Sequence, residues 1–257
     1  DHAITIARIN TAAKVNQGNR ESGSQASVHV AAAADTTESV LDGAAGGAGS
    51  AAITGVVTVY IGNKETVAEI LSSEVFAEGD IEVSALSSSN VTIIGAGVAA
   101  GGSAGVGATA TVVTFEDTTK AYASGTLKSN GSIRVLSDAD EKLEVTTISI
   151  DAAGTAGVGV TVAVVVFTGK TISEVGSSAN FDAKGDIQII AQSKENIHTA
   201  AAGVAGAGTA SFEGVVSVDV VNVTTQAVID DSTAAAKGTF KAGGNFLIKA
   251  YDQSELQ

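Results

Sequence analysis

The chain has 257 residues and contains no proline, cysteine, methionine or tryptophan, although average usage would give about a dozen prolines at this length. Proline removes a backbone donor from a sheet, so its absence indicates a chain that is hydrogen-bonded in strands over most of its length, and the absence of cysteine excludes disulfides and thiolate metal sites. The formal net charge of −14 argues against nucleic acid and an anionic membrane surface as partners, because both require a positive patch.

The first residues resemble the end of a repeat whose beginning is missing. Ile4–Val15 contains a short alternating strand, Thr11-x-Ala13-x-Val15, without the Gly-Ala hinge that precedes such strands elsewhere. The chain also begins without methionine. We therefore expect residues 1–257 to be one continuous repeat array, an internal piece of a longer protein.

An apolar block of 33 residues then recurs four times. Each copy begins with polar or charged residues, passes through a Gly-Ala hinge and ends in a second alternating run. Each is followed by a strand of the type Thr-x-Ala-x-Ile, and the threonines of these strands are spaced at intervals of 53, 52 and 54. The four blocks are residues 33–65, 86–118, 138–170 and 192–224, and the threonines are Thr66, Thr119, Thr171 and Thr225.

A strand of the type Ile-x-Val-x-Ala opens each repeat, with one side chain in and one out, as expected for a strand with one buried face. Four of these strands follow a turn with glycine at a fixed place, which we interpret as a position where only glycine takes a positive φ without strain. The aligned apolar residues predict columns of stacked side chains. The turn glycines are Gly79, Gly131, Gly185 and Gly244, and the first two columns are Ile81/Ile133/Ile187/Phe246 and Val83/Val135/Ile189/Ile248.

These regularities predict an all-β fold, a parallel β-solenoid of repeats of about 53 residues, with two or three coils per repeat. We place the repeats at residues 28–80, 81–132, 133–186 and 187–245, with partial ones at 1–27 and 246–257. Insertions fall only between a closing strand and the next opening strand, which marks those segments as surface loops. Whether a block forms solenoid coils or a long antiparallel hairpin stays open at this stage.

The uncharged runs 86–115 and 152–169 are long enough to suggest membrane-spanning helices. We interpret them instead as strands buried on both faces, because they are rich in glycine, valine and threonine and recur in phase with charged segments.

No residue qualifies as catalytic, cofactor-binding or metal-binding, and we predict no enzyme activity and no cofactor. Gly169-Lys170-Thr171 lacks the second glycine of a phosphate-binding loop, since position 164 is Val164. The three histidines are scattered and are interpreted as surface residues. Acidic clusters could hold Ca²⁺, but they do not recur at one position, and a solvated acidic face is the favoured interpretation. The histidines are His2, His29 and His198, and the clusters are Glu78/Asp80/Glu82, Asp138/Asp140/Glu141 and Asp230/Asp231.

Two segment pairs carry a resemblance to a known family. They are 214–229 (GVVSVDVVNVTTQAVI) with 244–250 (GNFLIKA), and 104–123 (AGVGATATVVTFEDTTKAYA) with 131–139 (GSIRVLSDA). In this order of elements the chain resembles the large repetitive exoproteins of Gram-negative bacteria, the filamentous-haemagglutinin-like and leukotoxin-type filamentous adhesins. The resemblance implies a right-handed parallel β-helix, secretion through the outer membrane and a place at the cell surface.

The expected function is therefore an extracellular structural or adhesive segment of a bacterial surface filament or adhesin stalk. Its expected partners are further repeats or other copies stacking end to end and an unknown surface receptor, without nucleic acid and without membrane insertion. One alternative is a membrane-active or pore-forming toxin segment, which requires alternating lipid-facing and polar side chains. A second is a carbohydrate-active β-helix enzyme, for which Tyr60, Tyr122 and Tyr251 are too few and too dispersed.

Overall fold

The computed structural model describes residues 2–16, 25–230 and 237–257. Within these ranges the regular structure consists of strands and contains no helix, in agreement with the all-β prediction. The strands are β1 (His2–Ile9), β2 (Lys14–Val15), β3 (Val28–Ala48), β4 (Ala51–Ala77), β5 (Ile81–Gly101), β6 (Ala104–Ser129), β7 (Ile133–Ala153), β8 (Ala156–Val175), β9 (Asn180–Ala183), β10 (Ile187–Ala207), β11 (Ala210–Ile229), β12 (Thr239–Ala242) and β13 (Phe246–Leu256).

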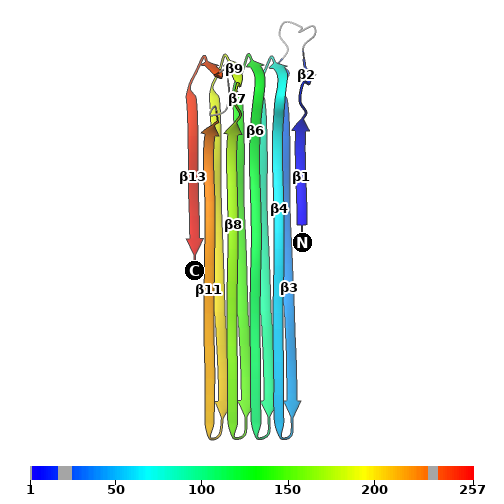
Figure 1. Ribbon diagram of the computed structural model, residues 1–257, viewed down its shortest axis with the longest axis vertical. Helices are drawn as coiled ribbons and strands as arrows, with labels where there is room; N and C mark the ends of the chain where they lie inside the picture. The colour runs from blue at the N-terminus through cyan, green and yellow to red at the C-terminus, as the bar shows by residue number, and fades with distance from the viewer. Residues whose placement is uncertain (1, 17–24, 231–236) are drawn as a thin grey trace.

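The strands form two parallel sheets that lie face to face (Figure 1). Sheet A has the order β1-β4-β6-β8-β11, with the short strands β2, β9 and β12 at its upper end, and sheet B has the order β13-β10-β7-β5-β3. Each repeat contributes one long strand to each sheet. The chain descends in sheet B, turns at the end we call the arch end, and returns in sheet A to the opposite end, the loop end. The architecture is that of a flat, solenoid-like stack.

The prediction of two or three coils per repeat was wrong, because each repeat makes one circuit. The opening strand and the first half of the block fuse into one strand of about 20 residues, as in β5, and the second half fuses with the closing strand, as in β6. The block is also not a hydrogen-bonded hairpin, since its two halves belong to different sheets. The two runs that resembled membrane helices are β-strands, as predicted. The expectation that both of their faces are buried was wrong, because outward side chains such as Val158 and Val160 are 40% and 38% exposed.

The predicted columns are confirmed by the register. Ile81 pairs with Ile133, Ile133 with Ile187, and Ile187 with Phe246. In sheet A, Phe115 pairs with Phe167 and their rings stack with centroids 5.9 Å apart. Equivalent residues of successive repeats thus lie beside one another, about 4.8 Å apart, and fill the space between the sheets with like side chains.

The first closing strand was misplaced in the sequence. The residue that pairs with Thr66 is Thr5, not Thr11, and the aligned triplet is Thr5-Ala7-Ile9. Thr11 lies instead in a turn between β1 and β2, where Ala12 has a φ of 62°. Both segments fit the same Thr-x-Ala pattern, so only the pairing with β4 distinguishes them.

The glycines of the loop-end turns are required for a different reason from the one expected. The only described glycine with a positive φ is Gly125. At Gly131 a Cβ would lie 2.3 Å from Asp80 Oδ1 and 2.9 Å from the carbonyl carbon of Gly79, and at Gly185 it would lie 3.0 Å from the Gly131 carbonyl oxygen. Successive turns stack so closely that no side chain fits between them.

The interior changes character along the strands. Near the loop end it is an aliphatic core that includes Ile70, Ile81 and Leu127, and in the middle a second core contains Phe115 and Phe167. A layer of buried polar and charged residues separates these two cores. Beyond the second core, toward the arch end, the interior consists of glycine, alanine, threonine and a few acids, such as Asp151. The polar interior is the candidate site.

Candidate functional site

The polar layer between the two cores is built by strands of both sheets. Sheet B contributes the row Thr36, Ser89, Glu141, Glu195 and Ser254, in which neighbours pair in register. Sheet A contributes Lys64 and Asp117, which also pair. Lys64, Asp117, Glu141 and Glu195 are all 2–3% exposed. Charged side chains are rarely buried to this degree unless they are paired, so this layer is the most unusual chemistry in the described chain.

Hydrogen bonds show how the carboxyl groups share the layer. The Ser87 hydroxyl lies 2.7 Å from Asp117 Oδ2 and 2.9 Å from Glu141 Oε1, but it can donate only one proton. A proton on Glu141 supplies the hydrogen that the second of these two contacts requires. Burial, followed by the hydrogen bond and charge of Asp117, raises the pKa of Glu141 to about 9. Burial also raises the pKa of the neighbouring Glu195.

Lys64 is the cation of this layer. Its Nζ donates to the Ser88 carbonyl oxygen at 2.6 Å and to Ser89 Oγ at 2.7 Å, and lies 4.0 Å from Asp117 Oδ2. The ammonium thus joins sheet A to sheet B and balances one carboxylate. The arrangement needs one charged carboxylate and one protonated acid around a single lysine.

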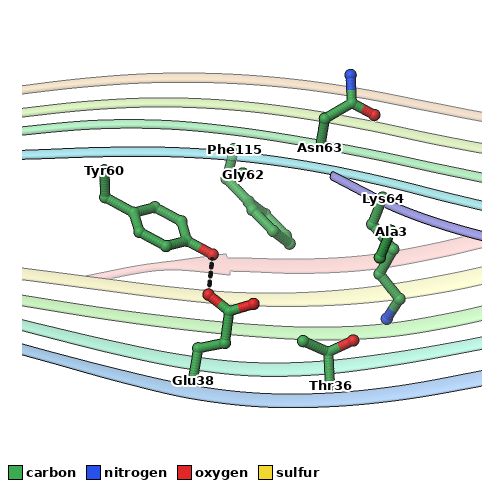
Figure 2. Close-up of a pocket in the computed structure, with 8 residues that line it drawn as sticks. All are labelled: Ala3, Thr36, Glu38, Tyr60, Gly62, Asn63, Lys64 and Phe115. Atoms are coloured by element: carbon green, nitrogen blue, oxygen red, sulfur yellow. Dashed lines mark hydrogen bonds between the residues drawn. The ribbon is translucent and has the colours of Figure 1, made fainter. Parts of the chain in front are cut away.

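Beside this layer, a small cavity opens between β3 and β4 (Figure 2). Tyr60 reaches across from sheet A and donates to Glu38 Oε2 at 2.6 Å; burial and this carboxylate raise the pKa of Tyr60. Lys64 points into the same space, whereas Asn63 points to the outside of the sheet. The cavity volume is about 10 Å³, which is room for no more than one water molecule. The geometry therefore suits a structural contact between the sheets and does not accommodate a substrate.

A second group of buried acids lies near the arch end. Asp151 is 1% exposed, and neither of its carboxylate oxygens has a hydrogen-bond partner. Glu213 approaches from the opposite sheet and accepts from Ser149 Oγ and Thr161 Oγ1, each at 3.2 Å. Burial and the negative charge of Glu213 raise the pKa of Asp151. These acids face buried threonines across the interior.

The acidic clusters seen in the sequence separate in the structure. Asp80 accepts from the backbone N–H of Ser132 at 2.7 Å, and Asp186 accepts from that of Asn245 at 2.6 Å, so these carboxylates bind the turn of the next repeat. Glu82 faces outward toward His29 and Arg134. Asp140 is exposed, but Glu141 is buried, so the interpretation of this cluster as a solvated face was wrong for Glu141. Asp231 lies outside the described residues.

The remaining sequence candidates lie apart from one another. His29 is exposed and faces outward, as expected, and His198 lies on the outer row of sheet B. Gly169, Lys170 and Thr171 lie in the middle of strand β8, where no helix follows. Tyr60 is between the sheets, whereas Tyr122 and Tyr251 lie with Lys120 and Lys249 near their rings. The structure does not bring these groups together.

Two shallow depressions occur nearer the loop end. One, of about 170 Å³, is lined by β6, β9 and β12, with Lys128, Asp182 and Lys241 among its residues. The other, of about 240 Å³, lies over β7, β10 and β13 and contains Asp140, Lys194 and Tyr251. Both depressions carry side chains of both charges on an open surface.

Sequence reasoning missed the residues of the buried layer. A signal was present, because Asp117 stands two residues after Phe115 and two before Thr119, on the alternation that the core residues follow. Lys64 likewise follows Tyr60 and Gly62 at even spacing. A charge on the buried alternation of a strand indicates a polar layer inside the fold rather than on its surface.

Comparisons with protein-family models, with curated proteins and with solved structures find no match to this chain. In residues 2–16, 25–230 and 237–257 no three metal-binding side chains of the histidine, cysteine or carboxylate type come together. The same ranges contain no helix that could span a membrane.

Proposed function

We propose that this chain is a rod-like segment of an extracellular bacterial surface filament or adhesin stalk, a closed right-handed β-helix that lengthens by adding repeats. The observation that carries the proposal is the state of the two ends of the stack. At one end, β1 and β2 pair with residues 63–70 and 74–75 of β4, and among the described residues neither β3 nor residues 51–62 of β4 has a partner on that side. At the other end, β13 pairs with residues 187–197 of β10 and leaves β11 as the edge of sheet A.

Both ends of the stack leave strand edges open. Unpaired strand edges are templates for a further strand. Each end presents one full-length parallel edge, β3 or β11, and in its other sheet a shorter edge strand, β1 or β13. The repeats already stack with almost no register shift, since β6 and β8 pair without interruption from Ala104 to Ala123. A further repeat, from the same protein or from another copy, would continue both sheets. The resemblance to filamentous adhesins supports the extracellular setting.

The alternative of a membrane-active segment has one observation in its favour. Near the arch end, the outward-facing side chains of β8 are valines, from Val158 to Val166, while Thr161 and Gly159 face inward. Against it stand the edges β3 and β11, whose unpaired backbone groups would enter lipid without hydrogen-bond partners. The rod is therefore the function that the geometry supports better.

A substitution in β11 tests the end contact. The backbone N–H groups of Ala210 and Asp230 both donate toward β8, and the pairing between them is continuous. Odd-numbered residues of β11 therefore direct their N–H away from β8, toward the open edge. Ser217→Pro removes one such donor without breaking a bond inside the chain.

We expect electron microscopy of the wild-type chain to show rods of variable length with a repeat of about 4.8 Å along the axis. Ser217→Pro should shorten the rods, and Ser217→Ala should leave their length unchanged. Wild-type particles of one uniform short length, unaffected by the proline, would remove the end-to-end proposal.

A further inference from the structure

The outer face of sheet A carries an apolar surface near the arch end, which we call the outer panel. It consists of the outward-facing residues in 53–61 of β4, 106–114 of β6, 158–166 of β8 and 212–220 of β11. None of these positions is charged. Exposure reaches 82% at Ile53 and 64% at Phe212, and is still 38% at Val160 in the middle of the sheet.

The distribution of polar groups in this part of the fold is inverted. The acids Asp151 and Glu213 and the threonines Thr109 and Thr161 face the interior, while valine and isoleucine face outward. Such a surface is unfavourable in water, because apolar area is more stable when it is buried. Contiguous exposed apolar patches of several hundred Å² therefore mark contact sites. Glu116 and Lys170, both exposed, lie just beyond the panel and mark its border.

We propose that the outer panel pairs with the outer panel of a second copy of this chain, sheet against sheet, with the strands of the two copies running in opposite directions. The panel is flat and regular, as face-to-face sheet packing requires. Four strands at about 4.8 Å and nine residues at about 3.3 Å cover about 570 Å² on each copy. A pair thus buries about 1,100 Å², which exceeds the roughly 1,000 Å² of a specific interface, and each further repeat enlarges it.

The antiparallel orientation follows from the charges. If the strands of the two copies ran in the same direction, Glu116, Glu69 and Glu174 would also enter the contact and lose solvation. In the opposite orientation the panels overlap and the charged halves extend into solvent on either side. A lipid bilayer is the less favourable occupant, because the unpaired edges of β3 and β11 would be left without hydrogen bonds in it. The pairing deepens the proposed function and rests on it for its setting, since it joins rods side by side.

The test is done in the Ser217→Pro background, so that end-to-end contacts contribute less to association. Val160→Asp places a charge inside the panel on the inner strand β8, away from both edges of the sheet. Thr168→Asp adds the same charge on the same strand and the same outer face, but beyond the panel. Far-UV circular dichroism checks that each variant keeps its β-structure, and Val57→Asp, at a position 69% exposed on β4, repeats the test on another strand.

Sedimentation velocity should show a dimer for Ser217→Pro and for its Thr168→Asp variant, and at least a tenfold weaker dimer for its Val160→Asp variant. A monomeric Ser217→Pro chain, or a dimer that resists both Val160→Asp and Val57→Asp, would overturn the pairing. So would flotation of the wild-type chain with phosphatidylcholine vesicles that Val160→Asp abolishes, because it would assign the panel to lipid. Failure of the end-to-end proposal is seen separately, as rod lengths that Ser217→Pro does not change.

Discussion

Glu141 keeps its proton because the space around it offers one lysine to several acids. Lys64 already bonds to Ser88 and Ser89, and Asp117 is its carboxylate partner. Glu195 pairs in register with Glu141 on the neighbouring strand, and a second negative charge at this distance would be repelled. Because Glu141 is neutral, the polar layer between the two cores contains no second negative charge beside Asp117 that Lys64 would have to balance.

The stability of the fold should therefore depend on the pH through Glu141. Its pKa is raised to about 9 in the folded chain, against about 4.3 when unfolded. Between these values the folded state holds a proton that the unfolded state has released, so stability is complete below the unfolded pKa and is lost as the pH rises toward 9. The loss is at most about 1.4 kcal/mol per pH unit for one group. Urea unfolding from pH 5 to pH 9 measures it.

Glu141→Gln should reduce this pH dependence and stabilise the chain at pH 8, because glutamine replaces the neutral acid. Glu144→Gln is the matched control. It lies on the outer face of the same strand with its side chain 42% exposed, and Lys142 lowers its pKa. Glu144 is therefore ionised in both the folded and the unfolded chain between pH 5 and pH 9. Equal slopes for the wild type and Glu141→Gln would show that Glu141 is ionised in the folded state.

At the scale of the strand, the arch end depends on glycines that lie over one another. A Cβ on Gly102 would lie 2.0 Å from the Gly49 carbonyl oxygen, and one on Gly154 would lie 2.1 Å from that of Gly102. At Gly208 the distance to the Gly154 oxygen is 2.4 Å. The obstructing atoms are backbone, which cannot rotate away. The stacking of repeats thus imposes glycine at a turn that has no requirement for a positive φ.

Gly154→Ala should consequently destabilise the chain by about 1–3 kcal/mol, the usual effect of forcing extra atoms into a packed site. Gly49→Ala is the control, because it occupies the equivalent turn in the first complete repeat and a Cβ there meets nothing within 4 Å. Its effect should be neutral or a gain of up to about 1 kcal/mol from the less flexible unfolded chain. Urea midpoints of the two variants give the comparison, and equal values would mean that the turns are not in contact.

The strands also show what the sequence could predict. Opening strands such as Ile81-x-Val83-x-Ala85 alternate with polar residues, so their buried face and their stacking columns were evident. In segments such as Val158–Phe167, the outer valines and the inner glycines and valines are all apolar, and alternation carries no information about the face. For the same reason the sequence predicts short strands where the structure has long ones, such as β8. Lys64 and Glu141 stand on the buried alternation of their strands, but the partners that they meet inside the fold depend on contacts between the sheets, which no local pattern contains.

At the scale of the whole molecule, the two ends of each strand are stabilised differently. Near the loop end the interior is aliphatic and closely packed around Ile133 and Ile187. Near the arch end, Thr109, Thr111 and Thr147 are buried without hydrogen-bond partners for their hydroxyl groups. Apolar burial is the main source of stability, whereas a buried polar group without a partner reduces it. The arch end should open more readily than the loop end.

Amide hydrogen exchange measured by mass spectrometry tests this within single strands. β5 and β7 have hydrogen-bonded neighbours on both sides along their whole length, so differences along them report the interior rather than an edge. Residues 81–93 and 133–145 should exchange slowly, and residues 95–101 and 147–153 faster, since exchange requires local opening. Pairing of the outer panel would cover the arch end of sheet A, so slower exchange there at high protein concentration would connect the two. Uniform protection along β5 and β7 would mean that the polar interior at the arch end is as stable as the aliphatic core.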